Sequence, residues 1–280
     1  MKVALTGGTG FIGQHVRNLL AKSEHDVLLV ARKQAKIAEL GANEKFVIAD
    51  ISENRNDWFD YLDQPDVLLH LAWGGLPNYL DSYHVDVELP SQVKFLNNLI
   101  IGGLCQLVVT GTCYEYGISD GEQYETQQNT PCTPYGIAKN ELRKFLAGLQ
   151  KTKNYELSWA RVFYPYGEGQ SKFSLFSELK SAALRGEKEF ELKNATSNLD
   201  FISVHEVAKV LVKLIEHKSG SGVVNVGSGV PTDVASFARS QIAGNDWGID
   251  LKLMSTQARH YESSSFWAST KKLREFLDAS

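Results

Sequence analysis

The sequence contains few cysteines and no long apolar run. Its 280 residues include three cysteines, Cys105, Cys113 and Cys132, an odd number without the spacing of a metal site. We therefore expect reduced thiols in a cytoplasmic protein. The longest apolar run, 67–76, contains a histidine and two glycines and is far shorter than the ~20 residues that span a bilayer. A disulfide-rich secreted protein and a membrane protein are both disfavoured.

An excess of positive charge is also missing. The chain has 29 Lys and Arg against 33 Asp and Glu, a formal net charge of −4. No basic field would attract nucleic acid or an anionic membrane, so we expect neither as a partner. The first residues, 1–6, already have the pattern of a strand, so we expect no signal peptide. A hydrophobic content of 43% is ordinary for a globular protein with a sizeable core.

Short aliphatic runs alternate with longer polar segments in the first part of the chain. This alternation is typical of repeated βαβ units around a parallel sheet. The expected strands lie at 3–6, 26–31, 45–49, 66–71, 106–110 and 157–162. The expected helices lie at 11–23, 33–41, 56–62, 91–104 and 135–151. We predict an α/β fold with a doubly wound parallel sheet.

The pattern changes after about residue 164. Helices are expected at 175–185, 204–217 and 233–242, and short strands at 189–192, 201–204 and 223–226. We predict that 1–164 binds a cofactor and carries the catalytic residues. The remainder, 165–280, is expected to form a smaller α/β substrate lobe, with about 201–226 able to return to the main domain.

A glycine cluster containing Gly7, Gly10 and Gly13 joins the first expected strand to the first expected helix. Glycines permit positive φ, let the backbone approach a pyrophosphate, and let the helix pack close to the strand. The helix N-terminus at Phe11 and Ile12 would add N–H donors. A lone glycine triplet can also be a simple tight turn. Its position at the start of a βαβ series favours a Rossmann-type dinucleotide-binding domain.

Two cations, Arg32 and Lys33, follow the second expected strand, where such domains contact the adenosine ribose. A carboxylate there would accept the 2′-hydroxyl of NAD, whereas an arginine accommodates the 2′-phosphate of NADP. With no acid at this tip, we expect NADPH, the alternative being a solvated basic start to a surface helix. Asp50, followed by Ile51, ends the third expected strand. It would either accept from the adenine amino group or cap the next turn.

Tyr135 and Lys139 are four residues apart on one expected helix, so they share a face. An ammonium group beside a phenol favours the phenolate and lowers its pKa, which suits proton transfer near neutral pH. The spacing also occurs by chance in ordinary helices. Thr112 lies 23 residues upstream of Tyr135, just after the fifth expected strand. Its hydroxyl could hydrogen bond a substrate oxygen that Tyr135 protonates.

With these motifs the chain resembles the extended short-chain dehydrogenase/reductase family of nucleotide-sugar epimerases, dehydratases and 4-ketoreductases. The resemblance covers nearly the whole length. The matching segments are 6–13, 70–72, 112–117, 135–139, 161–170, 200–208 and 225–229.

The resemblance implies a role for particular residues. Thr112, Tyr135 and Lys139 would be catalytic, and Tyr135 and Lys139 would also contact the cofactor. The backbone at Leu71 and Ala72 would line the cofactor cleft. Substrate contacts would come from Thr112 and from the set Trp73, Tyr114, Tyr164 and Arg259. The helices at 91–104 and 135–151 would form a homodimer.

Two departures from the family pattern narrow the expected reaction. Sugar dehydratases of the family carry Asp-Glu directly after the catalytic threonine, where this chain has Cys113 and Tyr114, so dehydration is disfavoured. An arginine that usually holds the substrate diphosphate is replaced by Leu199, which leaves Arg259 as the main expected phosphate ligand. The helix cations Lys172, Lys180 and Arg185 are the alternative ligands.

We expect an NADPH-dependent reductase that acts on a 4-keto-6-deoxyhexose linked to dTDP or CDP. The alternative is a nucleotide-sugar 4-epimerase with tightly bound NAD. A remote alternative is a non-catalytic protein that senses the cofactor.

Overall fold

A seven-stranded parallel sheet forms the centre of the protein, whose computed structural model describes residues 1–32, 40–254 and 261–279. The strand order is β3-β2-β1-β4-β5-β7-β12. The strands are β1 (Lys2–Thr6), β2 (Asp26–Ala31), β3 (Glu44–Ile48), β4 (Val67–His70), β5 (Gln106–Thr112), β7 (Glu156–Val162) and β12 (Gly222–Val226). Because the chain winds outward in both directions from β1, the edge between β1 and β4 is a topological switch point, where doubly wound folds bind ligands. The predicted fold class is confirmed.

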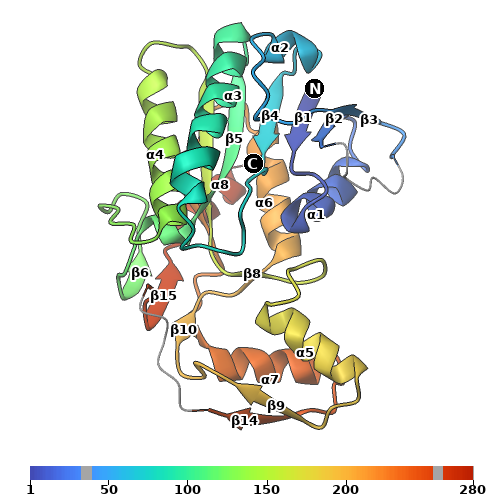
Figure 1. Cartoon of the computed structure of the whole chain (residues 1–280), viewed down its shortest axis with the longest axis vertical. Coiled ribbons are helices and arrows are strands. Elements are labelled where there is room, and N and C mark those ends of the chain that lie inside the picture. The colour runs from blue at the N-terminus through green and yellow to red at the C-terminus, as the bar shows by residue number, and fades with distance from the viewer. Residues whose placement is uncertain (33–39, 255–260, 280) are drawn as a thin grey trace.

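Helices cover both faces of this sheet (Figure 1). One layer contains α1 (Phe11–Leu20), α6 (Val204–Glu216) and α8 (Lys271–Asp278), and the other contains α2 (Trp58–Tyr61), α3 (Leu89–Gly102) and α4 (Pro134–Leu149). Successive residues of β1 point to opposite layers: Val3 and Leu5 pack with α1 and α6, whereas Ala4 packs with α3 and α4. Since both faces are covered, the central strands are apolar at nearly every position.

Local signals fix where α4 begins. Thr133 is its N-cap, and the Thr133 hydroxyl accepts from the Gly136 N–H at 3.1 Å. Pro134 occupies the first turn, where its missing N–H costs nothing. The buried residues Leu142 and Leu146 then place this helix against the sheet. The start of α4, including Tyr135, is therefore held at the carboxyl edge of the sheet.

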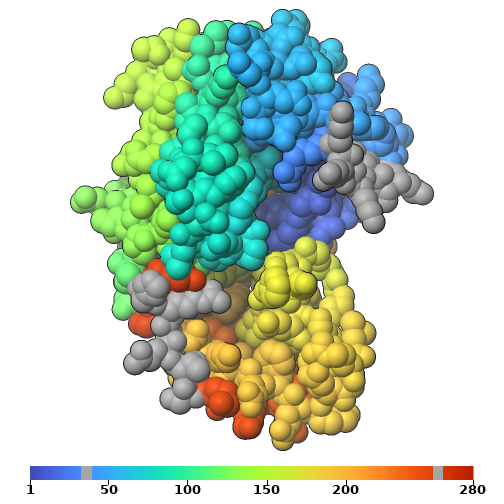
Figure 2. Space-filling model, viewed as in Figure 1, coloured from blue at the N-terminus to red at the C-terminus, as the bar shows by residue number. Residues whose placement is uncertain are grey.

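A smaller group of elements lies beyond that edge. It includes α5 (Leu175–Leu184), α7 (Val234–Gly244) and the paired strands β9 (Glu189–Leu192) and β14 (Asp250–Leu253). The arrowheads of β1 and β4 point towards it (Figure 1). In the space-filling view, the teal segment after β4 and the yellow segment that leads into α5 face each other across a hollow in the surface (Figure 2). This hollow lies at the carboxyl ends of the central strands.

Short strands connect the two groups of elements. A four-stranded sheet has the order β13-β10-β15-β6, from β13 (Thr232–Asp233), β10 (Asn198–Leu199), β15 (Ser265–Ala268) and β6 (Gly121–Gln123). β8 (Pro165–Tyr166) pairs with β11 (Ile202–Ser203). None of the helices within the described ranges is long and apolar enough to cross a membrane. All three cysteines are free thiols.

The structure differs from the sequence-based prediction in several elements. The expected sheet of six strands has a seventh, β12, which pairs with β7. This strand lies within the stretch, about 201–226, for which the sequence leaves open a return to the main domain. The helix expected at 56–62 is the single turn α2, which ends because Asp63 and Gln64 adopt positive φ. A π-helical turn, His84–Glu88, precedes α3 and was not predicted. The helix expected at 33–41 falls largely outside the described residues.

Candidate active site

The glycine turn between β1 and α1 has no room for side chains. Gly7 has a φ of 72°, and a Cβ there would lie 2.7 Å from the backbone nitrogen of Ala72 and the carbonyl carbon of Leu71. A Cβ on Gly13 would lie 2.1 Å from the Gly7 carbonyl oxygen. The Gly10 N–H donates to that same oxygen at 2.9 Å. The turn is therefore packed directly on the backbone after β4, as a close approach to a pyrophosphate requires.

The N-terminus of α1 is open to an anion. Its N-cap is Gly10, which has no side chain to bond the first-turn N–H groups. Phe11 and Ile12 begin the helix and are partly buried, so the predicted loop residues all lie at one place. A phosphate at this position would receive backbone N–H donors and the positive end of the helix dipole. The turn thus fits the pyrophosphate of a dinucleotide.

The predicted adenosine-side residues lie at the ends of β2 and β3. Arg32 directly follows β2 and is exposed, and Lys33 lies outside the described residues. Asp50 caps its own turn, since its Oδ1 accepts from the Ser52 N–H at 2.9 Å and the Ser52 hydroxyl at 2.7 Å. These bonds, with a smaller contribution from Arg32, lower the pKa of Asp50. Ile51 packs against the core beneath α3.

Tyr135 and Lys139 lie side by side at the end of β5. Both are buried on α4, and the Lys139 ammonium donates to the Thr110 carbonyl at 2.8 Å. The same ammonium lies 4.0 Å from the ring centre of Trp73. The Thr112 side chain is close enough to the Tyr135 phenol to act against burial and lower the pKa of that phenol. The structure thus brings together the three residues that the sequence predicts to be catalytic; their roles stay predictions.

Burial disfavours every charge in this cluster. It lowers the pKa of Lys139 to about 7 and raises the pKa of Tyr135, with the Thr112 hydrogen bond acting in the opposite direction on the phenol. Burial, with a smaller contribution from Lys139, also lowers the pKa of His70 to about 3. His70 is therefore neutral and fixed between the Thr6 hydroxyl and the Gln92 side chain. The cluster is a low-dielectric site in which an added charge would interact strongly with its neighbours.

Aromatic side chains surround the Tyr135 phenol. Tyr79 stacks on Tyr114 with ring centres 4.7 Å apart, and the Tyr114 hydroxyl donates to Glu262 at 2.9 Å. The Trp73 indole N–H donates to Nδ1 of His84 at 3.1 Å. Tyr79, His84 and Glu262 were not predicted as site residues from the sequence. The concentration of aromatic residues between 73 and 84 was a usable signal for the first two.

The expected substrate-side residues are only partly described. Tyr164 is half-buried and near enough to Tyr114 to add to the effect of burial in raising the pKa of that phenol. Arg259 lies outside the described residues. Of the alternative cations, Lys180 pairs with Glu168 and Arg185 pairs with Glu187. Lys172 lies 5.0 Å from the ring centre of Phe173.

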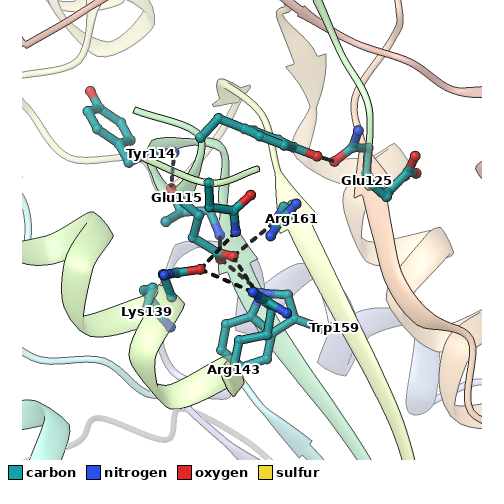
Figure 3. A network of polar contacts seen from close by, with 12 residues as sticks. Tyr114, Glu115, Glu125, Lys139, Arg143, Trp159 and Arg161 are labelled. Carbon is teal, nitrogen blue, oxygen red and sulfur yellow. Dashed lines mark hydrogen bonds and ion pairs between the residues drawn. The ribbon is translucent and has the colours of Figure 1, made fainter. Parts of the chain in front are cut away.

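Figure 3 shows the Glu115 side chain facing Arg143, Trp159 and Arg161. Glu115 Oε1 accepts from the Thr112 N–H at 2.9 Å and from the Trp159 indole N–H at 2.8 Å. Its Oε2 accepts from Arg161 Nε at 2.8 Å and lies 3.8 Å from Arg143 Nε. Glu115 and Arg161 are almost completely buried. Glu115 was given no role from the sequence: the Thr112-x-x-Glu115 spacing of a capping box was a usable local signal, whereas Trp159 and Arg161 come from a distant strand.

Comparison with protein families identifies the chain. The model of the NAD dependent epimerase/dehydratase family matches residues 3–227, which include the glycine turn, Thr112 and the Tyr135–Lys139 pair. The chain belongs to this family. The match confirms the resemblance to nucleotide-sugar enzymes of the extended short-chain dehydrogenase/reductase type.

Individual members of the family align with most of this chain. A dTDP-6-deoxy-L-talose 4-dehydrogenase (NAD(+)) from Aggregatibacter actinomycetemcomitans is 28% identical over 95% of this chain and 99% of its own length. A dTDP-6-deoxy-L-talose 4-dehydrogenase (NAD(P)(+)) from Kitasatospora kifunensis is 27% identical over 81% of this chain and 74% of its own. The UDP-N-acetylglucosamine 4-epimerase of Methanobrevibacter ruminantium M1 superposes with a TM-score of 0.85 at 21% identity, covering 98% of this chain and 91% of its own. The structural match supports the epimerase/dehydratase fold alone.

Proposed function

We propose that this member of the epimerase/dehydratase family is an NAD(P)H-dependent 4-ketoreductase. Its substrate would be a 4-keto-6-deoxyhexose linked to dTDP or CDP, and its product the 4-hydroxy sugar. The observation that carries the proposal is the buried Tyr135–Lys139 pair, with the Thr112 side chain close by, at the same sheet edge as the glycine turn.

Each of the three residues has a distinct task in this reaction. The Thr112 hydroxyl binds the C4 oxygen of the sugar, and the Tyr135 phenol protonates that oxygen. The Lys139 ammonium holds the nicotinamide ribose and stabilises the phenolate that remains. The dinucleotide, held by its pyrophosphate at Gly7, Gly10 and Gly13, supplies the hydride. A buried site suits this chemistry because water cannot compete for the groups that receive charge.

The residues after Thr112 argue against sugar dehydration. Cys113 is a buried thiol whose pKa is raised by burial, so it is a poor acid or base near neutral pH. The Tyr114 hydroxyl is bonded to Glu262, and burial also raises its pKa. Neither side chain replaces the Asp-Glu pair expected in a dehydratase.

The talose 4-dehydrogenases support the choice of substrate. A 4-dehydrogenase and a 4-ketoreductase catalyse one reaction in opposite directions, and both relatives are named for a dTDP-linked 6-deoxy sugar. Their names differ in the cofactor, NAD(+) or NAD(P)(+). For this chain, the exposed Arg32 at the end of β2 favours NADPH.

Further expectations complete the proposal. Residues 1–164 would bind the cofactor and 165–280 most of the substrate, with Arg259 as the main ligand of the diphosphate. A cytoplasmic homodimer would use α3 and α4, on which Ile101, Ile137 and Phe145 are exposed apolar side chains.

The test is a stoichiometric assay with purified protein. A panel of nucleotide-linked 4-keto-6-deoxy sugars is mixed with NADPH or NADH, and both the absorbance of the reduced cofactor and the sugar product are followed. The proposal predicts one cofactor oxidised for each 4-hydroxy sugar formed. Interconversion of 4-hydroxy sugars without net cofactor consumption would identify an epimerase instead.

A further inference from the structure

We propose that Glu115 is a positioning residue, which holds Thr112 in the orientation that the reaction needs. This inference rests on the proposed function, because it assigns Glu115 a role only through the Thr112 hydroxyl. Glu115 would not touch the substrate or the cofactor.

The contacts of Glu115 converge on the backbone of Thr112. Its carboxylate accepts the Thr112 N–H, while the Thr112 Oγ1 accepts the Tyr114 N–H at 3.3 Å, so the two residues form a reciprocal capping box. This arrangement fixes Thr112 in an extended conformation, with φ −147° and ψ 149°. The direction of the Thr112 hydroxyl follows from that backbone, because Oγ1 is attached to Cβ and is itself held by the Tyr114 N–H.

The end of β5 is held from two sides. Lys139 donates to the carbonyl of Thr110, and Glu115 accepts from the N–H of Thr112. Between them, a Cβ on Gly111 would lie 2.1 Å from the Trp159 indole nitrogen and 2.5 Å from Glu115 Oε1. The strand therefore packs directly on the Glu115–Trp159 hydrogen bond, and a displacement of this carboxylate would move the backbone that carries Thr112.

A contribution to stability does not by itself explain a buried carboxylate at position 115. A buried ion pair such as Glu115–Arg161 often contributes no more to stability than an apolar pair of similar volume. The Glu115 carboxylate contributes to the geometry instead, because this one planar group accepts three hydrogen bonds, from Thr112, Trp159 and Arg161. A displaced Glu115 carboxylate would shift Thr112 relative to the reacting atoms. A displacement of about 1 Å there can lower the rate roughly a hundredfold.

The Glu115→Gln variant tests the role with little change in volume. A carboxylate has two acceptor oxygens, whereas an amide has one acceptor and one donor. In either orientation, the amide NH₂ therefore faces Arg161 or faces Thr112 and Trp159. We expect kcat to fall ~10-fold or more, while KM for the sugar and Kd for NADPH change less than about threefold.

A double-mutant cycle with Thr112→Ala separates positioning from general damage. If Glu115 acts through the Thr112 hydroxyl, Glu115→Gln costs nothing further in the Thr112→Ala background, within about twofold. A merely structural role would give the same fold loss of kcat in both backgrounds, and that result would overturn the proposal. Arg143→Gln is the matched control, because it removes the ion pair at 3.8 Å but none of the three hydrogen bonds of Glu115; it should lower Tm with little change in kcat.

A second variant covers poor folding of Glu115→Gln. Glu115→Leu with Arg161→Met replaces the whole ion pair by apolar groups, which is commonly tolerated. The proposal predicts the same loss of kcat in this folded protein, and wild-type kcat would contradict it. Failure of the underlying function looks different: wild-type protein would then oxidise no NADPH with the 4-keto sugars. Failure of the catalytic roles alone would leave Thr112→Ala and Tyr135→Phe with wild-type reductase activity. If those two lose activity and Glu115→Gln does not, only the positioning role is wrong.

Discussion

The ammonium nitrogen of Lys139 lies 4.0 Å from the centre of the Trp73 ring, in a site that water hardly reaches. The cation–π contact and the hydrogen bond to Thr110 do not fully replace hydration, so burial lowers the pKa of Lys139 from 10.5 to about 7. The buried charge of Lys139, which the proposed reaction uses, therefore destabilises the folded protein when no ligand is bound.

This relationship predicts how stability depends on pH. Between about pH 7 and pH 10 the unfolded chain binds a proton at Lys139 that the folded protein has released, so stability rises with pH in this window. Lys139→Met should remove the cost of burying the Lys139 charge and so raise Tm by several degrees at pH 7. The same variant should make Tm depend less on pH between pH 7 and pH 9. Thermal unfolding of both proteins at several pH values tests this. Parallel Tm curves for variant and wild type would contradict the shift.

Tyr135→Phe removes the proposed proton donor. We expect kcat for reduction to fall ~10²-fold or more, because a general acid is lost, with NADPH affinity nearly unchanged. Tyr155→Phe is a matched control: Tyr155 is also a buried tyrosine, and its hydroxyl donates to the Leu146 carbonyl, away from the site. The control should lose about 1 kcal/mol of stability and keep its activity. Near wild-type turnover in Tyr135→Phe would exclude the mechanism.

Gly13→Ala tests the cofactor turn. The new Cβ would lie 2.1 Å from the Gly7 carbonyl oxygen, so the turn must open and its pyrophosphate contacts are lost. Titration with NADPH should show affinity reduced by at least ~10-fold, since charge-assisted hydrogen bonds of roughly 1.5–3 kcal/mol are broken. Gly148→Ala, in α4, has no atom within 4 Å of the new Cβ and should bind NADPH normally. Equal affinities in the two variants would place the dinucleotide elsewhere.

Arg32 tests the choice between the two cofactors. An arginine–phosphate contact of ~1.5–3 kcal/mol corresponds to a roughly ten- to hundredfold preference for NADPH over NADH. Arg32→Ala should lose this preference by weakening NADPH alone, with the Kd for NADH unchanged as the internal control. Wild-type protein that binds NADH as tightly as NADPH would overturn the expectation.

Arg259 is the expected anchor of the substrate diphosphate. Arg259→Ala should raise KM for the nucleotide sugar ~10-fold or more, because a charged hydrogen bond is lost, while kcat and NADPH affinity change little. Lys180 is already paired with Glu168, so Lys180→Ala should leave KM near its wild-type value. If steady-state kinetics showed a raised KM in Lys180→Ala and an unchanged KM in Arg259→Ala, the diphosphate would be assigned to the helix cations.

Local signals carried much of the prediction from sequence. Glycine spacing located the turn at Gly7 and Gly13, and the four-residue spacing of Tyr135 and Lys139 placed both on the buried face of α4. Both features depend on neighbours within one or two helical turns. The alternation of strands and helices likewise gave the parallel sheet.

Long-range contacts account for what the sequence did not predict. Glu115 meets Trp159 and Arg161 across more than forty residues of chain, and no local pattern marks that meeting. The sequence predicts a strand at 223–226 and leaves open its return to the main domain, but its aliphatic pattern does not specify a partner; the structure pairs β12 with β7 as the seventh strand. The π-helical turn 84–88 was not predicted, because Pro90 indicated that the helix begins at about residue 90.

Counting cofactor against product tests the central claim most directly. Wild-type protein is incubated with catalytic or stoichiometric NADPH and a dTDP-linked 4-keto-6-deoxyhexose, and the sugar is analysed as the cofactor absorbance falls. Our account predicts that 4-hydroxy sugar forms only while NADPH is consumed, in a ratio of one to one, and that Tyr135→Phe all but stops both. In a parallel incubation that starts from the 4-hydroxy sugar, formation of its C4 epimer with no net change in the cofactor would contradict it.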